Sequence, residues 1–145
     1  MYRNILLPTD GSKLAGKAVT HGVELAKRLD ANITVLTVTT PFHVFTVDTQ
    51  MLEDTQSQYR TRMRKHVART LDAVAKTAKR AGISCDTRHV EHEHVYKAII
   101  DTAKSKGCDL IVMASHGRRG ISAIVLGSET IKVLTHSKIP VLVHR

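Results

Sequence analysis

The residues best suited to chemistry form a glycine-rich segment between residues 114 and 128. The segment contains Gly117 and Gly120, with two arginines between them, and it ends in Gly127-Ser128 ahead of a helical pattern. Glycine lets backbone N–H groups approach an anion closely, and the start of a helix offers unpaired N–H donors. The segment therefore predicts phosphate binding, and a connecting loop with a helix cap at Ser128 is the structural alternative.

Two widespread phosphate motifs do not describe this segment. A Walker A loop ends in Gly-Lys-Ser or Gly-Lys-Thr, and no such tripeptide stands at the needed spacing. A dinucleotide-binding fingerprint follows the first strand of its domain, whereas these glycines follow the fourth predicted strand. Neither motif class identifies the ligand.

A second candidate segment, Pro-Thr-Asp-Gly-Ser, occupies residues 8–12. Proline and glycine mark a turn here, and Ser12 can cap the helix that follows. Asp10 can face a ligand, or it can act as an Asx-turn residue beside Gly11, and the two roles are compatible.

Histidine is abundant in this chain, which has nine. His92 and His94 alternate around Glu93, with His89 nearby, but their spacing matches no structural zinc signature. His116, in the glycine-rich segment, can contact phosphate or exchange a proton near neutral pH, although a packed loop histidine is the simpler interpretation. We therefore assign no metal site and no catalytic residue.

The elements that must position these residues alternate between strand and helix. Apolar runs predict strands near 5–7, 33–38, 83–90, 110–113 and 141–143, and helical patterns fall at 12–30, 50–81, 95–106 and 129–136. Strands separated by helices form parallel sheets through right-handed crossovers. Ligands bind such sheets at the carboxyl ends of strands, where the strand order reverses, and both candidate segments follow strands.

Size and composition predict a single domain covering residues 1–145. The chain is 42% apolar, which indicates a packed core. Cys85 and Cys108 are interpreted as buried free thiols, which fits the reducing cytoplasm. The first residues do not resemble a signal peptide, and no apolar run reaches the length of a membrane span. We expect a cytoplasmic protein without a membrane partner.

The net charge of +9 is concentrated in one segment. Residues 60–88 hold nine lysines and arginines against Asp72 and Asp86. A basic segment of this kind can bind nucleic acid, but no aromatic residue within it offers a platform for base stacking. A solvated helix face is the favoured interpretation, and we predict no nucleic-acid partner.

The whole chain resembles the single-domain members of the universal stress protein family. The resemblance rests on residues 5–12, 109–117, 126–128 and 140–143. It implies an adenine-nucleotide alpha-hydrolase-like α/β fold: an open five-stranded parallel sheet of order 3-2-1-4-5, with helices on both faces. It also implies a homodimer paired through the C-terminal strand, residues 140–144.

ATP-binding members of this family carry glycine, two residues, glycine, nine residues, and then Gly-Ser or Gly-Thr. Gly117 and Gly127-Ser128 match this motif, but Ala114 replaces its first glycine. Alanine fits with little strain if its φ is negative, and costs about 1 kcal/mol if φ is positive. The implied nucleotide contacts are Pro8, Thr9, Asp10, Val38, Met113, Ala114, His116, Gly117, Arg118, Gly120, Gly127, Ser128 and Glu129. Mg²⁺ would accompany ATP through its phosphates.

The resemblance thus implies a small ATP-binding regulatory protein of the stress response. One alternative is a nucleotide-free dimeric interaction module, which the departure at Ala114 favours. Another is a slow ATPase. Phosphoryl transfer needs a group that positions the attacking water, and none is evident beside the phosphate segment, so we expect at most weak hydrolysis.

Overall fold

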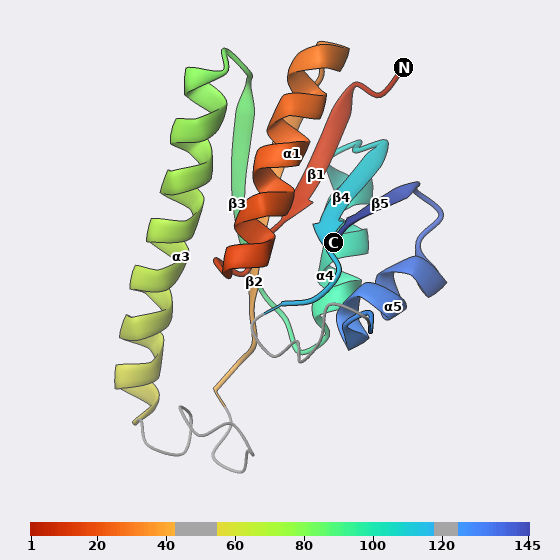
Figure 1. Ribbon diagram of the computed structural model, residues 1–145. Helices are drawn as coiled ribbons and strands as arrows, with labels where there is room; N and C mark the ends of the chain where they lie inside the picture. Colours follow the sequence, from red (N-terminus) through yellow and green to blue (C-terminus); the bar gives the residue numbers. More distant parts are fainter. Residues whose placement is uncertain (43–54, 118–124) are drawn as a thin grey trace.

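The computed structural model describes residues 1–42, 55–117 and 125–145. Five parallel strands form one sheet in the order β3-β2-β1-β4-β5, with helices on both faces (Figure 1). The strands are β1 (Asn4–Pro8), β2 (Asn32–Thr39), β3 (Cys85–Glu91), β4 (Leu110–Ala114) and β5 (Val141–His144). This order confirms the predicted sheet and puts the reversal of strand order between β1 and β4.

The helices begin and end at residues suited to those positions. They are α1 (Lys13–Leu29), α3 (Gln56–Arg80), α4 (Val95–Ser105) and α5 (Ser128–His136). Ser12 caps α1 as predicted, because its hydroxyl accepts a hydrogen bond from the Ala15 N–H at 3.3 Å. Gly82 follows the end of α3 with a φ of +73°, which glycine adopts readily.

The predicted second helix, residues 50–81, is not continuous through Thr55. Thr55 is in an extended conformation and forms a capping box with Gln58, so α3 begins at Gln56. Apolar periodicity does not mark the first turn of this helix. The capping pair of Thr55 and Gln58 is the sequence signal that marks its start. The prediction for residues 50–54 lies outside the described residues.

Within the described residues, two helices cover each face of the sheet. On one face, Ile5, Leu7 and Val35 pack with residues of α1 and α3 in one apolar cluster. On the other face, Leu6 and Leu36 pack with residues of α4 and α5. Adjacent residues therefore face opposite helix layers, which is why the strands read as continuous apolar runs. Fully burying one such aliphatic side chain contributes about 1.5–3 kcal/mol to folding.

Both cysteines are free, as predicted. Cys108 is buried and Cys85 is half-buried, and burial raises the pKa of each thiol above its ordinary value. A raised thiol pKa disfavours the reactive thiolate, so we assign no thiol chemistry to these residues. Cys108 packs within the core and Cys85 packs against it. Among the described residues, no helix combines the length and apolar character needed to cross a bilayer.

Candidate functional site

The two candidate segments emerge side by side from the sheet. β1 pairs with β4 in parallel register, with Ile5 opposite Leu110 and Leu6 opposite Ile111. Because the strands run in the same direction, the loops that follow them leave the same edge of the sheet (Figure 1). The structure thus brings residues 8–12 next to the residues that follow Ala114.

The loop after β1 is held by its own hydrogen bonds. The buried Thr9 donates its backbone N–H to the Leu36 carbonyl at 2.9 Å, and its hydroxyl accepts from the Gly11 N–H at 3.2 Å. The Asp10 Oδ1 atom accepts a hydrogen bond from the Ser12 N–H at 2.9 Å, so the predicted Asx-turn is confirmed. The turn fixes the backbone of Asp10 at the rim of the sheet.

Helix α3 supports this loop through a residue that the sequence did not single out. His66 donates its Nε2–H to the Asp10 carbonyl at 2.8 Å, because a carbonyl oxygen can only accept. Gly11 has a φ of +79°, and a Cβ there would lie 2.7 Å from Thr70 Oγ1 and 2.8 Å from His66 Cε1. The i, i+4 spacing of His66 and Thr70 puts both on the helix face that meets the loop.

Asp10 and Gly117 join the two loops. A Cβ placed on Gly117 would lie 2.5 Å from the Oδ2 atom of Asp10. The carboxylate therefore occupies the space that any larger residue at position 117 would need. Asp10 is half-buried and Gly117 is exposed, so the contact lies at the surface of the protein.

Ala114 is accommodated at the end of β4 without backbone strain. Among the described residues, Asp30 is the one non-glycine residue with a positive φ, so the φ of Ala114 is negative. Its methyl group is buried in a small cluster with Ala15 and Ala18 of α1. The extra carbon thus faces a helix, and the strain considered for a positive φ does not arise.

Gly127 lies so close to the end of β4 that a side chain there would be tightly packed. Its N–H donates to the Ser115 carbonyl at 2.7 Å, and a Cβ on Gly127 would lie 3.0 Å from the Cα of His116. The buried Thr130 strengthens this junction by donating its hydroxyl to the carbonyls of Ala114 and Ser115, at 3.0 and 3.1 Å. These contacts bring the start of α5 against the end of β4.

The N-terminus of α5 is not capped by a side chain. The N-cap residue is Gly127, and Ser128 is the first residue of the helix, so the alternative of a cap at Ser128 is wrong. The first N–H groups of a helix have no intrahelical partner, and they lie at the positive end of its dipole. Together with the closely packed Gly127, this arrangement suits a phosphate group.

The side chain of Glu129 serves another helix. Its Oε2 atom accepts a hydrogen bond from the Tyr96 N–H at 2.9 Å, and its Oε1 atom lies 3.5 Å from the Nζ atom of Lys132. Glu129 thereby caps the start of α4 from α5. The backbone N–H of Glu129 remains as its contribution to the candidate site.

The remaining predicted contacts occupy different depths. Met113 is buried and packs in the core with the α4 and α5 layer, and the half-buried Val38 packs against the same core. Pro8 is half-buried at the end of β1. The His116 Nδ1 atom lies 3.3 Å from the Ser115 hydroxyl. The predictions for Arg118 and Gly120 lie outside the described residues.

The histidines at 89–94 make local contacts. The backbone N–H of His94 donates to the Nδ1 atom of His92 at 2.8 Å, and the ring centroids of these residues are 6.0 Å apart. The ring of His89 is hydrogen-bonded to the Thr39 hydroxyl at 2.7 Å. No group of three or more His, Cys, Asp or Glu residues within the described ranges is arranged to hold a metal ion.

Comparison with known proteins finds relatives of one family that align with the whole chain. The model of the universal stress protein family matches residues 1–145. The universal stress protein YxiE of Bacillus subtilis is 30% identical over 149 residues, which cover 100% of both chains. The match therefore extends over the whole chain and beyond the glycine-rich segment.

Solved structures share the fold. The structure of MJ0577 of Methanocaldococcus jannaschii has a TM-score of 0.81 and 26% identity, covering 99% of this chain and 95% of that one. A universal stress protein solved with cAMP has a TM-score of 0.73 and 23% identity, covering 99% and 97% of the two chains. An Archaeoglobus fulgidus homologue solved with dAMP has a TM-score of 0.68 and 18% identity, covering 99% and 98%. With a family match from the first residue to the last, the chain belongs to the universal stress protein family.

Proposed function

We propose that this chain binds an adenine nucleotide, with ATP favoured, between the loop after β1 and the start of α5. The observation that carries the proposal is the uncapped N-terminus of α5, packed against the end of β4 through Gly127. Its free N–H donors would bind phosphate oxygens. The cAMP and dAMP complexes of proteins with this fold support an adenine nucleotide as the ligand class.

The other side of the proposed site supplies the groups for the ribose and the base. Asp10 belongs to the loop after β1, and its carboxylate lies against Gly117 of the loop after β4. This carboxylate can accept hydrogen bonds from ribose hydroxyls. Val38, the last residue but one of β2, lies on the face of α4 and α5 and offers an apolar surface for the base. Mg²⁺ would arrive with ATP, bound chiefly by phosphate oxygens, as Mg²⁺ prefers in nucleotide sites.

The packing of Ala114 weakens the alternative of a nucleotide-free module. That alternative rested on the missing motif glycine, but the methyl group is taken up by α1. We expect binding without appreciable turnover, because the Glu129 carboxylate at the start of α5 is held by the Tyr96 N–H and by Lys132, away from a water-positioning role. The protein would therefore report nucleotide levels through a bound state, and not through hydrolysis.

We further propose that two copies associate through β5. This strand lies at the edge of the sheet, where its outer backbone groups are open to pairing with another strand. All four of its residues are half-buried, and the nearby helix α5 exposes Ile131 and Leu134. Analytical ultracentrifugation should give twice the chain mass, and a monomer at about 100 μM would contradict the proposal. The two free thiols support a cytoplasmic location.

The nucleotide proposal is tested by calorimetric titration with ATP, AMP and cAMP, together with mass spectrometry of nucleotide that copurifies. Replacing Gly127 with alanine should weaken ATP binding by about tenfold, since the new Cβ would lie 3.0 Å from the Cα of His116 and the start of α5 would shift slightly to relieve that contact. Gly16→Ala is the matched control, because a Cβ there meets nothing within 4 Å. Absence of saturable binding at millimolar nucleotide would reject the proposal.

A further inference from the structure

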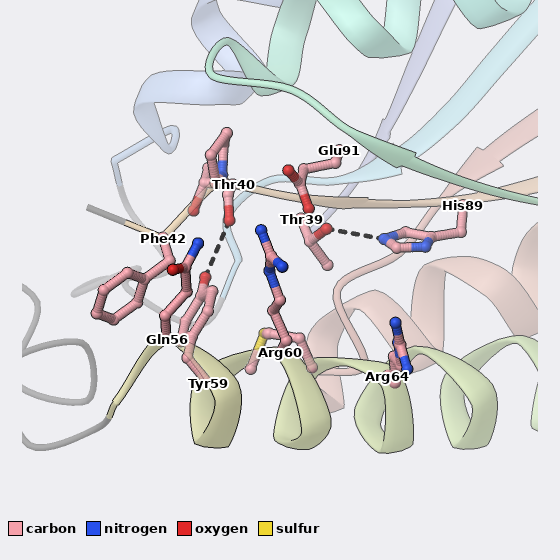
Figure 2. A pocket seen from close by; sticks show the side chains of 11 residues that line it. Thr39, Thr40, Phe42, Gln56, Tyr59, Arg60, Arg64, His89 and Glu91 are labelled. Carbon is pink, nitrogen blue, oxygen red and sulfur yellow. Dashed lines mark hydrogen bonds between the residues drawn. The ribbon is translucent and has the colours of Figure 1, made fainter. Parts of the chain in front are cut away.

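A second hollow lies at the carboxyl edge of the sheet, between the ends of β2 and β3 and the first turns of α3 (Figure 2). Three elements wall it: Thr39 of β2, His89 and Glu91 of β3, and Arg60 and Arg64 of α3. We call this hollow the arginine cavity. Its volume of about 340 Å³ falls within the range of about 300–1,000 Å³ that is typical of small-molecule sites.

The arginine cavity and the proposed base contact lie on opposite faces of the sheet. Thr39 pairs with Glu91, and His89 is two residues before Glu91, so all three side chains share one face of the pleated sheet. That face is covered by α3. Val38 alternates with Thr39 and packs on the face of α4. The cavity is therefore separate from the base subsite of the proposed nucleotide site.

The walls of the arginine cavity are fixed by contacts between its elements. The Tyr59 hydroxyl donates to the Thr40 carbonyl at 3.0 Å, which ties the start of α3 to the end of β2. The Phe42 and Tyr59 rings lie 5.4 Å apart, and the hydrogen bond between Thr39 and His89 at 2.7 Å joins the two strands. The cavity thus combines a rigid polar wall with two aromatic rings.

The charged groups of the cavity are not paired with each other. Figure 2 shows the Arg60 and Arg64 side chains rising from α3 toward the strand residues. Within the described ranges, neither guanidinium makes a hydrogen bond or an ion pair, and the Glu91 carboxylate makes none either. Two arginines against one glutamate leave the lining with a net positive charge. Guanidinium groups bind phosphate and carboxylate through two parallel hydrogen bonds.

A neighbouring groove on α3 shows what the cavity has in addition to charge. That groove lies over residues 57–69 and contains Arg62, Lys65 and Arg69, yet every lining residue belongs to the same helix. It has no strand wall and no aromatic ring, so it offers only a charged surface. The arginine cavity differs because three elements enclose it and Tyr59 is buried at its side.

We propose that the arginine cavity binds a small molecule that carries one phosphate or carboxylate group on a flat apolar body. The guanidinium groups of Arg60 and Arg64 hold the anionic group, and the rings of Phe42 and Tyr59 contact the apolar body. Glu91 accepts a hydrogen bond from a ligand hydroxyl or amine. The ligand binds independently of the nucleotide, because the two sites use different faces of the sheet.

The test is a titration with phenyl phosphate, followed by NMR shifts of the backbone amides and of the arginine Nε–H groups. Saturable shifts are expected at Thr39, His89 and Arg60, with and without saturating ATP. Inorganic phosphate alone and phenol alone should each bind at least about tenfold more weakly, since each supplies only one of the two contacts. Benzoate in place of phenyl phosphate shows whether the cavity prefers carboxylate or phosphate.

The double variant R60Q/R64Q should weaken phenyl phosphate at least about tenfold, because both charged hydrogen bonds are lost. The control K65Q/R69Q removes the same charge from the other groove of α3, and should change affinity less than about twofold. Equal losses in both variants would show general attraction to a basic helix and would overturn the proposal. Competition with ATP, shifts confined to Gly117 and Ser128, or no saturation by about 10 mM would do the same. Only the competition outcome requires that ATP binds; the shifts and the two double variants test the cavity without ATP, because the shifts locate the ligand directly.

Discussion

The carboxyl edge of the sheet carries two regions that are built in opposite ways. At the ends of β1 and β4, Gly117 and Gly127 are in close contact with Asp10 and His116, and the candidate donors are backbone N–H groups. At the ends of β2 and β3, the arginine cavity is lined by long side chains from a helix and two strands. The first region depends on the absence of Cβ atoms, whereas the second depends on charge, so substitutions should damage them differently.

The largest effect is expected from Gly11→Ala, which should lower the free energy of unfolding by about 2–4 kcal/mol. Its positive φ costs alanine about 1–2 kcal/mol, and the added methyl must displace His66 and Thr70. Gly82→Ala is the control, because Gly82 has a similar φ but nothing within 4 Å. Chemical denaturation measures both variants. Equal losses would show that His66 and Thr70 give way, and that α3 does not brace the loop.

His66→Leu should weaken nucleotide binding about three- to tenfold, because the Asp10 carbonyl loses its hydrogen bond. His66→Gln keeps an N–H donor and should restore most of the affinity. Calorimetry with ATP measures this effect, and phenyl phosphate binding to the arginine cavity serves as the internal control. If leucine and glutamine behaved alike, packing and not the hydrogen bond would connect α3 to the loop.

Ala114→Gly should change ATP affinity less than about twofold, although it restores the family motif. The alanine methyl packs on Ala15 and Ala18, away from any strained backbone. The glycine variant should instead unfold about 0.5–1 kcal/mol more easily, because glycine gains more freedom in the unfolded chain. Tighter ATP binding by tenfold or more would show that the methyl group obstructs the nucleotide.

Asp86→Asn should have the smallest effect, and none on either ligand. Asp86 begins the other end of β3, and its hydrogen bond with Lys106 at 2.9 Å lowers the pKa of the carboxyl group. A lowered folded pKa stabilises the fold above the unfolded pKa, about 3.9, and this contribution is lost as pH falls through the folded pKa. Because the pair is exposed, we expect the substitution to lower the free energy of unfolding by about 0.5 kcal/mol at pH 7 and by less at pH 3. Chemical denaturation at the two pH values measures this. A changed ATP affinity would show that the effect of Asp86 extends beyond its end of the sheet.

The sequence by itself determined the strand and helix pattern, the free state of the two cysteines and the position of the Asx-turn at Asp10. These features depend on neighbours within a few residues: alternation of apolar and polar side chains, capping residues and turn residues. The resemblance over the whole chain added the strand order, which local periodicity cannot supply. Apolar periodicity alone does not locate the start of α3, which is set by the capping pair of Thr55 and Gln58.

Only the tertiary structure decided which distant residues meet. His66 reaches the Asp10 carbonyl from 56 residues away, Ala114 packs on α1, and Glu129 caps α4 from α5. The arginine cavity was likewise hidden, since Arg60 and Arg64 read as part of a solvated basic face until β2 and β3 were brought against α3. Such contacts follow from crossover connections and helix packing, and these bring together residues whose spacing along the chain carries no signal of their contact.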